Sequence, residues 1–432
     1  MFIRILNSEM ELATGCTEPG AVALTAAEAG QALRKAGVDK AEEITVNASI
    51  NIIKNAMSAG IPGTDYEGMD YAAAIGALGG DPVYLLEVMN HVPRETVEAA
   101  AALVKAGKVR VNVAQVPQKL YIEVIAKGGG HTGRAIVRDL HTNVVLVEQD
   151  GAATLDKRDT DTAAAGDSDV VSPEQIASFL TVRSIWDYCT KELDPMNDPI
   201  DIIRSAVKVN SVISNEGLSK EYGLAIGRNL DLNCRKGLMT RDLTTNSMIA
   251  AAAGADARMA GAPVSVVANS GSGNQGITCS VPLIEYAKEL HSGKEKLYRA
   301  LIISNLVAIH EKTGIGTLSA YCGAVSAGAG AGAGIVYLCG DGYQAAIHTV
   351  VNALAIVSGI VCDGAKASCA AKIASSVDAA LLGYNMYKCN QEFKGGDGIV
   401  MKDIETTIKG IGRLGKDGMR QTNEEIIRLM MS

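Results

Sequence analysis

The sequence has few aromatic residues, little positive charge and no recognisable export signal. Aromatic residues make up 4% of the 432 positions, and the formal net charge is −8. Nucleic acids and anionic lipid surfaces bind proteins through basic faces, so this charge balance argues against both as partners. No basic segment followed by an apolar stretch and a cleavage site is visible near the N-terminus, so we expect a cytoplasmic protein without a signal peptide.

Charge is also missing from one long stretch of the C-terminal half. Residues 318–340 contain no charged residue over 23 positions, and 342–361 contain only His348. Two such runs, joined at Asp341-Gly342, are long enough for a membrane hairpin. However, much of the first run is Ala and Gly, which contribute little transfer free energy, and no aromatic belt or basic loop flanks it. We therefore expect two helices buried in a protein core and no membrane partner, with a membrane hairpin as the alternative.

Small residues take the place of the missing aromatic ones. The chain contains 46 glycines, and 47% of its residues are hydrophobic. A chain of this length and composition folds into two or three globular domains. Small side chains let helices approach closely, so we expect densely packed helices rather than a large β-sandwich.

The N-terminal part alternates between strand and helix patterns. EITVNASI (43–50) places apolar residues at every second position, which is the period of a half-buried strand. Later β segments are separated by Pro-Gln and Gly-Gly-Gly turns. The predicted strands are 43–50, 109–113, 120–126, 134–139 and 143–150; the predicted helices are 5–36, with Thr17 as a cap, 71–79 and 94–106.

The pattern changes after residue 155. Residues 156–173 are polar, rich in Asp and small residues, and without a hydrophobic period, as in a solvated linker. We therefore predict an α+β fold with a mixed α+β unit at 1–155 and an all-α unit at 174–432, with helix 5–36 packing on either. Helices are predicted at 174–191, 198–214, 218–228, 243–254, 277–290, 296–311, 317–338, 343–360, 366–383 and 422–431.

The nine cysteines do not form a disulfide framework, because they are odd in number and the chain shows no sign of export. Cys322 begins the small-residue run, and Cys362 and Cys369 follow within IVCDGAKASC (360–369). Thiolates from separate segments that meet at a small-residue pocket suit an iron–sulfur cluster. Zinc is also possible, although a CxxC pair is absent here. The remaining alternative is three buried cysteines acting as small hydrophobic residues.

Two further segments carry candidate site residues. In GCTEP (15–19), Cys16 stands at a helix start, where the positive helix end favours a thiolate, unless it is only a structural residue beside a cap. In NSGSGNQG (269–276), the glycines allow a nest of backbone N–H groups that suits a carboxylate or phosphate. A dinucleotide site is disfavoured because no βαβ unit surrounds the glycines. Asp256 and Arg258 are expected to form a helix-surface pair.

These segments together resemble the L-cysteine desulfidase family, whose relatives are the iron–sulfur L-serine dehydratases. The resemblance spans essentially the whole chain, and GCTEP with SGSGNQG is its most specific part. The matching segments are GCTEPGAVAL near the N-terminus, KNAMSAGIPGT (54–64), GGHT (129–132), HTN (141–143), DARM (256–259), SGSGNQG (270–276) and the set Cys322, Cys362 and Cys369.

The resemblance implies α,β-elimination of L-cysteine to sulfide, ammonia and pyruvate, with a [4Fe–4S] cluster on the three cysteines and no pyridoxal cofactor. An open iron would then act as a Lewis acid. Cys16 is implied as the base for the α-proton or as a resting ligand of the fourth iron. Lys54 and His131 are the other candidate catalytic residues; candidate substrate-binding residues are Thr17, Glu18, Asn55, Thr132, Ser270, Gly271, Ser272, Gly273 and Asn274.

The sequence departs from the dehydratases at two places. It ends in MMS rather than in a cysteine, and GGHT only partly matches their SSHT motif. Both departures favour L-cysteine over L-serine as substrate. L-Serine dehydration and a non-catalytic thiol- or metal-binding protein are the alternatives, and a homo-oligomer is possible.

Overall fold

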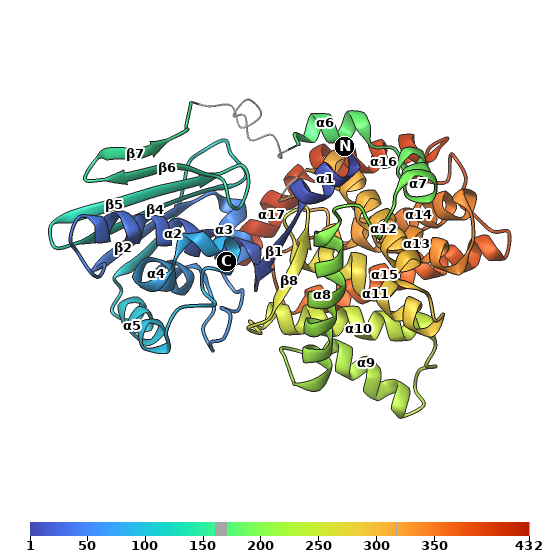
Figure 1. Cartoon of the computed structure of the whole chain (residues 1–432), viewed down its shortest axis with the longest axis horizontal. Coiled ribbons are helices and arrows are strands. Elements are labelled where there is room, and N and C mark those ends of the chain that lie inside the picture. The colour runs from blue at the N-terminus through green and yellow to red at the C-terminus, as the bar shows by residue number, and fades with distance from the viewer. Residues whose placement is uncertain (160–170, 317, 432) are drawn as a thin grey trace.

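A six-stranded mixed sheet lies at one end of the molecule and a group of helices at the other (Figure 1). The computed structural model describes residues 1–159, 171–316 and 318–431. Its architecture is α+β, as the sequence predicts. The strand order is β3-β2-β4-β5-β6-β7; β2 and β3 run parallel, and every other neighbouring pair is antiparallel.

The sheet buries one face against helices α2 and α4. The alternation predicted for 43–50 is present in β2, where Ile44, Val46 and Ala48 point into the core. These elements form one hydrophobic cluster. The elements of this part are β2 (Glu43–Ala48), β3 (Val109–Val113), β4 (Tyr121–Gly128), β5 (His131–Arg138), β6 (Val144–Gln149), β7 (Ala152–Asp156), α2 (Thr17–Lys35), α3 (Ile50–Ala56), α4 (Met69–Gly79), η1 (Pro82–Glu87) and α5 (Arg94–Lys105).

Helix α13 (Gly323–Cys339) forms the centre of the helical part and contacts α11, α12, α14 and α15. Its small residues permit close packing: a Cβ on Gly330 would lie 2.4 Å from the carbonyl oxygen of Ser304 on α12. Burial on all sides explains why this segment lacks charge. Within the residues that the structure describes, no helix is both long and apolar enough to cross a membrane.

The helical part contains most of the remaining elements. They are α6 (Pro173–Phe179), α7 (Val182–Asp187), η2 (Tyr188–Glu192), α8 (Asp201–Ser219), α9 (Ile226–Arg235), α10 (Leu243–Met259), β8 (Ser265–Asn269), α11 (Gly273–Glu289), α12 (Lys294–Ile315), α14 (Tyr343–Val357), α15 (Ser368–Lys388), α16 (Ile404–Arg413), η3 (Leu414–Gly418) and α17 (Arg420–Met431).

The helix predicted over 5–36 is wrong in its first half. The chain instead forms α1 (Phe2–Glu9), β1 (Met10–Thr14) and then α2, with Cys16 at the N-cap and Thr17 as the first helical residue. Strand β1 pairs antiparallel with β8, from Met10 opposite Asn269 to Thr14 opposite Ser265. The pairing energy comes from a partner far away in the sequence, so local periodicity could not reveal this strand.

Strand β8 is a small exception to the prediction that everything after 174 is helical. It pairs antiparallel with β1, and none of the described residues from 260 to 300 forms a parallel sheet. The predicted helix 218–228 is displaced, because α8 continues to Ser219 and α9 begins only at Ile226. The predicted linker 156–173 begins where β7 ends and finishes where Ser172 caps α6, and most of it lies outside the described residues. The domain boundary therefore stays a prediction.

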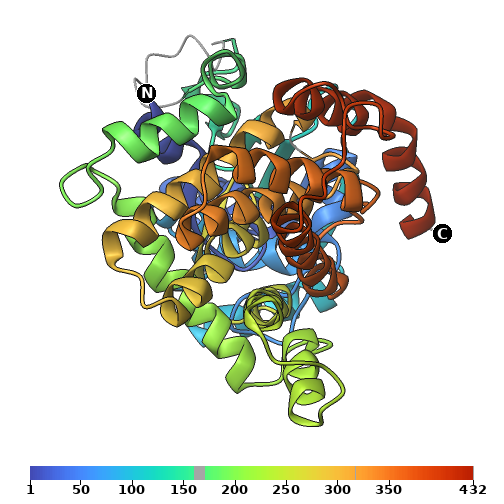
Figure 2. The ribbon, with the colours of Figure 1, turned by 90° about the vertical axis from the view of Figure 1, so that its right-hand side faces the viewer.

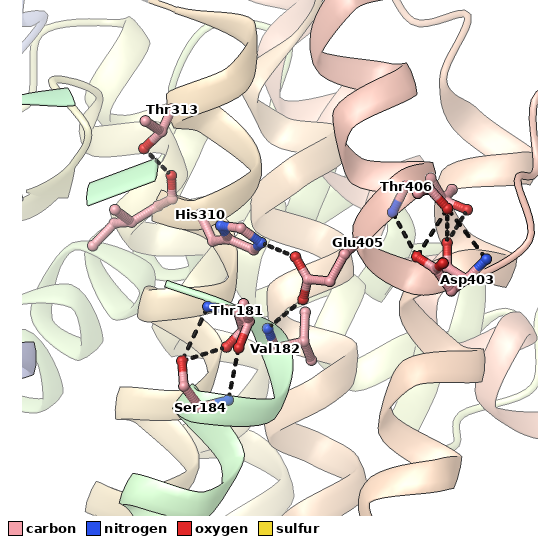
Figure 3. Close-up of polar contacts among 10 residues, drawn as sticks. Thr181, Val182, Ser184, His310, Thr313, Asp403, Glu405 and Thr406 are labelled. Carbon is pink, nitrogen blue, oxygen red and sulfur yellow. Dashed lines mark hydrogen bonds and ion pairs between the residues drawn. The ribbon is translucent and has the colours of Figure 1, made fainter. Parts of the chain in front are cut away.

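The C-terminal helices connect distant parts of the molecule. Figure 2 shows the red C-terminal helices at the margin of the helical part. Glu405 on α16 accepts a hydrogen bond from the backbone N–H of Val182, at 2.7 Å, and lies 2.7 Å from Nε2 of His310 on α12 (Figure 3). Beyond α16, helix α17 contacts α3: Asn423 accepts a hydrogen bond from Lys54 and donates one to Asn51.

Candidate functional site

A cavity of about 110 Å³ lies where the sheet part meets the helical part. Four helices, α2, α11, α13 and α15, begin at this cavity, and residues of their first turns or N-caps line its wall. Because each helix start carries a partial positive charge, the cavity favours anions. A second cavity of about 290 Å³ adjoins it and shares His141, Ser270, Gly271 and Lys312 with it.

Glu18 is the centre of a hydrogen-bond network at one end of the cavity. Its carboxylate accepts hydrogen bonds from Cys16 Sγ at 2.9 Å, Thr17 Oγ1 at 3.0 Å and Asn55 Nδ2 at 2.8 Å. His141 Nε2 lies 3.9 Å from Glu18 Oε1, within ion-pair distance. All five side chains are buried, so the network is shielded from water and its charges interact strongly.

The charges of this network shift the pKa values of its members. Burial alone would raise the pKa of Glu18, but His141, Cys16 and Asn55 outweigh it and hold that pKa well below its usual range. Burial opposes protonation of His141, yet the Glu18 carboxylate raises its pKa. Burial and the negative charge of Glu18 raise the pKa of Cys16 well above its usual value. The thiol is therefore a hydrogen-bond donor here, and the position at a helix start does not by itself make it a thiolate.

The loop before α11 faces this network. Ser270 and Gly271 take positive φ angles of 46° and 73°, and backbone hydrogen bonds in both directions between Asn269 and Ser272 close a tight turn. The Thr17 hydroxyl donates to the Gly271 carbonyl at 2.9 Å, which ties the start of α2 to this loop.

Cys322, Cys362 and Cys369 line the same cavity. Cys322 is the N-cap of α13, Cys362 lies in the loop before α15, and Cys369 lies in the first turn of α15. An antiparallel bridge between Tyr321 and Val361 holds the first two segments together. The structure thus brings all three cysteines to one place.

Burial and mutual electrostatic repulsion raise the pKa values of two of these thiols, Cys322 and Cys369. Burial first, and then the neighbouring charge of Cys362, raise the pKa of Cys322 to about 12. Burial likewise raises the pKa of Cys369, with a further contribution from Cys362. Within the described part of the chain, no three or more His, Cys, Asp or Glu side chains are arranged to hold one metal ion. In a cluster each thiolate binds a different iron, so three thiols spread around a cavity fit a cluster better than a single ion.

Most of the predicted site residues lie at this cavity. Lys54 is buried just behind the wall and donates to the Cys362 carbonyl at 3.4 Å. His131 and Thr132 lie apart from the cavity: His131, half-exposed at the start of the interior strand β5, pairs with Asp150 at 2.8 Å. The predicted residues that line the cavity are Cys16, Thr17, Glu18, Asn55, Ser270, Gly271, Ser272, Asn274, Cys322, Cys362 and Cys369; Gly273 lies behind them against Arg258.

Three basic residues of the cavity were not predicted as site residues. They are His141, Arg258 and Lys312. His141 lies in HTN and Arg258 in DARM, two segments of the family resemblance, and this resemblance was the sequence signal that could have identified them. The predicted surface pair of Asp256 and Arg258 is wrong, because both residues are buried and no hydrogen bond or ion pair joins them.

Comparison with known proteins gives consistent matches. A family model described as "Serine dehydratase alpha chain" matches residues 86–428. A UPF0597 protein of Oleidesulfovibrio alaskensis is 42% identical over 431 residues, which cover 100% of this chain and 97% of that protein. A UPF0597 protein of Desulfitobacterium hafniense is 42% identical over 434 residues, with 100% and 96% coverage. A third, from Lachnoclostridium phytofermentans, is 42% identical over 431 residues, with 100% and 99% coverage.

Proposed function

Because the chain belongs to the serine dehydratase alpha chain family, we propose that it is an iron–sulfur-dependent amino-acid lyase that acts on L-cysteine. The reaction is α,β-elimination, which gives sulfide and aminoacrylate and then pyruvate and ammonia. The observation that carries the proposal is that the Cys16 thiol and three further cysteines line one small, positively polarised cavity. A base and a polarising centre must both reach a substrate only about 5 Å long, so they must share such a cavity.

Cys322, Cys362 and Cys369 are the residues that would hold a [4Fe–4S] cluster. The donor set fits this cofactor, because three free thiols, one buried and two half-buried, line the cavity beside the small residues Gly323 and Ala324. The raised pKa values of Cys322 and Cys369 mean that iron would have to displace the protons of these two thiols on binding. When bound by three thiolates, such a cluster supplies an open iron that acts as a Lewis acid on the substrate.

Cys16 is the group that we assign to the α-proton. Its sulfur lies at the cavity wall, where Glu18 accepts its hydrogen bond, and the thiol must lose its proton before it can act as the base. His141 and Asn55 fix the orientation of the Glu18 carboxylate. Arg258 opposes the rise in the pKa of Cys16 and so favours the thiolate that the elimination needs.

L-Serine is the second candidate substrate, since the family takes its name from serine dehydration. The same cavity, base and cluster would serve either amino acid. The partial GGHT match favours L-cysteine.

Anaerobic iron and sulfide reconstitution of the protein, followed by turnover assays with each amino acid, tests the proposal. We expect a brown protein that releases sulfide and pyruvate from L-cysteine faster than it releases pyruvate from L-serine. Cys322→Ala should lose both the visible absorbance and the turnover. Faster turnover of L-serine would reverse the substrate assignment. A colourless protein without turnover of either amino acid would contradict the lyase.

A further inference from the structure

Arg258 carries a buried charge that no group in the described protein neutralises. The residue is only 3% exposed, in the last turn of α10. Among the described residues, its guanidinium has no hydrogen-bond or ion-pair partner, and Nε is buried without an acceptor. A buried, unpaired cation destabilises a fold, so such a group usually has a role with a ligand.

The nearby carboxylate of Asp256 does not act as that partner. Residues two apart on a helix point to nearly opposite sides. Accordingly, Asp256 Oδ2 accepts a hydrogen bond from the backbone N–H of Gly227, at 2.9 Å, on the side of α9. Arg258 instead lines the candidate cavity, where its positive charge acts on Cys16, His141 and Cys369.

The fold makes room for this guanidinium at the start of α11. A Cβ on Gly273 would lie 2.3 Å from Arg258 Nε and 2.9 Å from its central carbon, so only glycine lets the group lie there without displacement. The guanidinium thus lies beside the positive end of α11 and the turn at Ser270–Ser272. Two sources of positive charge at one point of a cavity attract an anion.

Lys312 is the other cation on the cavity wall, but it faces different groups. Its strongest favourable interactions are with Cys362 and Cys322, at the thiol side of the cavity. Arg258 also has the planar, two-pronged donor geometry that matches a carboxylate, which an ammonium lacks.

We propose that Arg258 binds the α-carboxylate of the substrate through its guanidinium, with the start of α11 beside it. This inference rests on the proposed function, because it assumes a small amino acid in the cavity. It makes Arg258 the residue that selects α-amino acids over amines of the same size.

Arg258→Gln in the anaerobically reconstituted protein tests the role, with Arg258→Lys as the conservative control. Steady-state turnover of L-cysteine is measured in the presence of each of two inhibitors. The first, 3-mercaptopropionate, keeps the carboxylate of L-cysteine, and the second, cysteamine, lacks it. For Arg258→Gln we expect KM to rise roughly 100-fold and inhibition by 3-mercaptopropionate to be lost. Inhibition by cysteamine and the cluster absorbance should stay as in the native protein. For Arg258→Lys we expect a KM and a 3-mercaptopropionate inhibition between those of the native protein and Arg258→Gln, since lysine keeps the positive charge but lacks the two-pronged donor geometry.

Thermal stability separates this role from a structural one. Removal of an unpaired buried charge should leave Tm equal or raise it, whereas loss of a structural residue should lower it. An unchanged KM and unchanged 3-mercaptopropionate inhibition in Arg258→Gln would overturn the proposal while leaving the lyase intact.

The same variants are informative if the native protein turns over neither amino acid. The shift in Tm caused by L-cysteine, L-serine or 3-mercaptopropionate then reports binding alone. A shift in the native protein that is absent in Arg258→Gln would support the carboxylate site without the lyase. If none of these carboxylates shifts the Tm of the native protein, the proposed carboxylate site is overturned.

Discussion

At the scale of single residues, Cys16 is the strictest test of the proposed chemistry. Cys16→Ala should lower sulfide release and α-proton exchange at least about 100-fold, because it removes the base. The cluster absorbance should largely remain, because Cys322, Cys362 and Cys369 are unchanged. Cys389→Ser, at an exposed position, is the matched control and should behave as the native protein. Near-normal turnover of Cys16→Ala would place the base elsewhere, and Lys54 would be the next residue to replace.

Gly273 gives an independent test of the Arg258 site. Gly273→Ala places a Cβ against the guanidinium, so we expect a raised KM for L-cysteine and weaker 3-mercaptopropionate inhibition. Alanine favours a helix more than glycine does, so loss of helix stability cannot explain such a result. Gly293→Ala is the control, because Gly293 also lies at a helix start, as the N-cap of α12, and a Cβ there meets no atom within 4 Å. Unaltered kinetics in Gly273→Ala would mean that Arg258 does not bind the substrate carboxylate from its place beside Gly273.

The sequence predicted many residues of this candidate site, but not the basic residues His141, Arg258 and Lys312. Cys16, the glycine-rich turn and the three cysteines stand in short, specific segments that can be recognised without a structure. His141 and Arg258 lie in a loop and in an alanine-rich helix, where the pattern does not tell which side faces a cavity. The direction of a side chain in such segments is set by tertiary packing, so only the fold revealed it.

At the scale of elements, Asn210 completes the short sheet that supports the glycine-rich turn. Its buried side chain accepts from the Val267 N–H at 2.8 Å and donates to the Val267 carbonyl at 3.3 Å, closing the free edge of β8. Asn210→Leu leaves both backbone groups buried and unpaired, so the free energy of unfolding should fall by about 3–5 kcal/mol in urea titrations. Asn229→Leu, exposed on α9, removes only a solvent-exposed hydrogen bond to the Leu224 carbonyl and should change it by no more than about 1 kcal/mol. Equal stability of the two variants would contradict this role.

Glu405 gives the docking of α16 a dependence on pH. Burial opposes its ionisation, but the hydrogen bonds of His310 and Val182 lower its pKa. Because the folded pKa is the lower one, its stabilisation is full above the unfolded value of about 4.3 and is lost as the pH falls through the folded value. Glu405→Gln should therefore cost about 1–2 kcal/mol at pH 7, and the difference from the native protein should shrink below about pH 4. A constant difference across this range would show that the carboxylate charge is not responsible.

Elements with local signals were easier to predict than those that depend on distant partners. The alternation in 43–50 and the small-residue runs after 318 were sufficient to place β2, α13 and α14. Strand β1 has only five residues, and its partner β8 lies more than half the chain away. Its stability comes from that pairing, so local periodicity predicts one long helix over 5–36 instead of a strand at Met10–Thr14.

At the scale of the whole molecule, the two parts of the chain are joined by more than their connecting segment. Ile5, Leu6 and Met10 belong to the hydrophobic core of the helical part, and β1 pairs with β8. At the other end of the chain, Asn423 on α17 joins the helical part to α3. The cavity, with walls from both parts, depends on these contacts.

Co-expression of residues 1–159 and 171–432 as separate polypeptides tests how much of the assembly depends on these contacts. We expect the two fragments to co-purify in equal amounts and to bind iron together, because the N-terminal segment buries apolar side chains in the other fragment. A first fragment that lacks residues 1–14, and with them α1 and β1, should fail to co-purify. If the complete fragments elute separately, or the shortened fragment still binds, the N-terminal segment does not hold the two halves of the cavity together. The contacts of α17 would then have to provide that attachment.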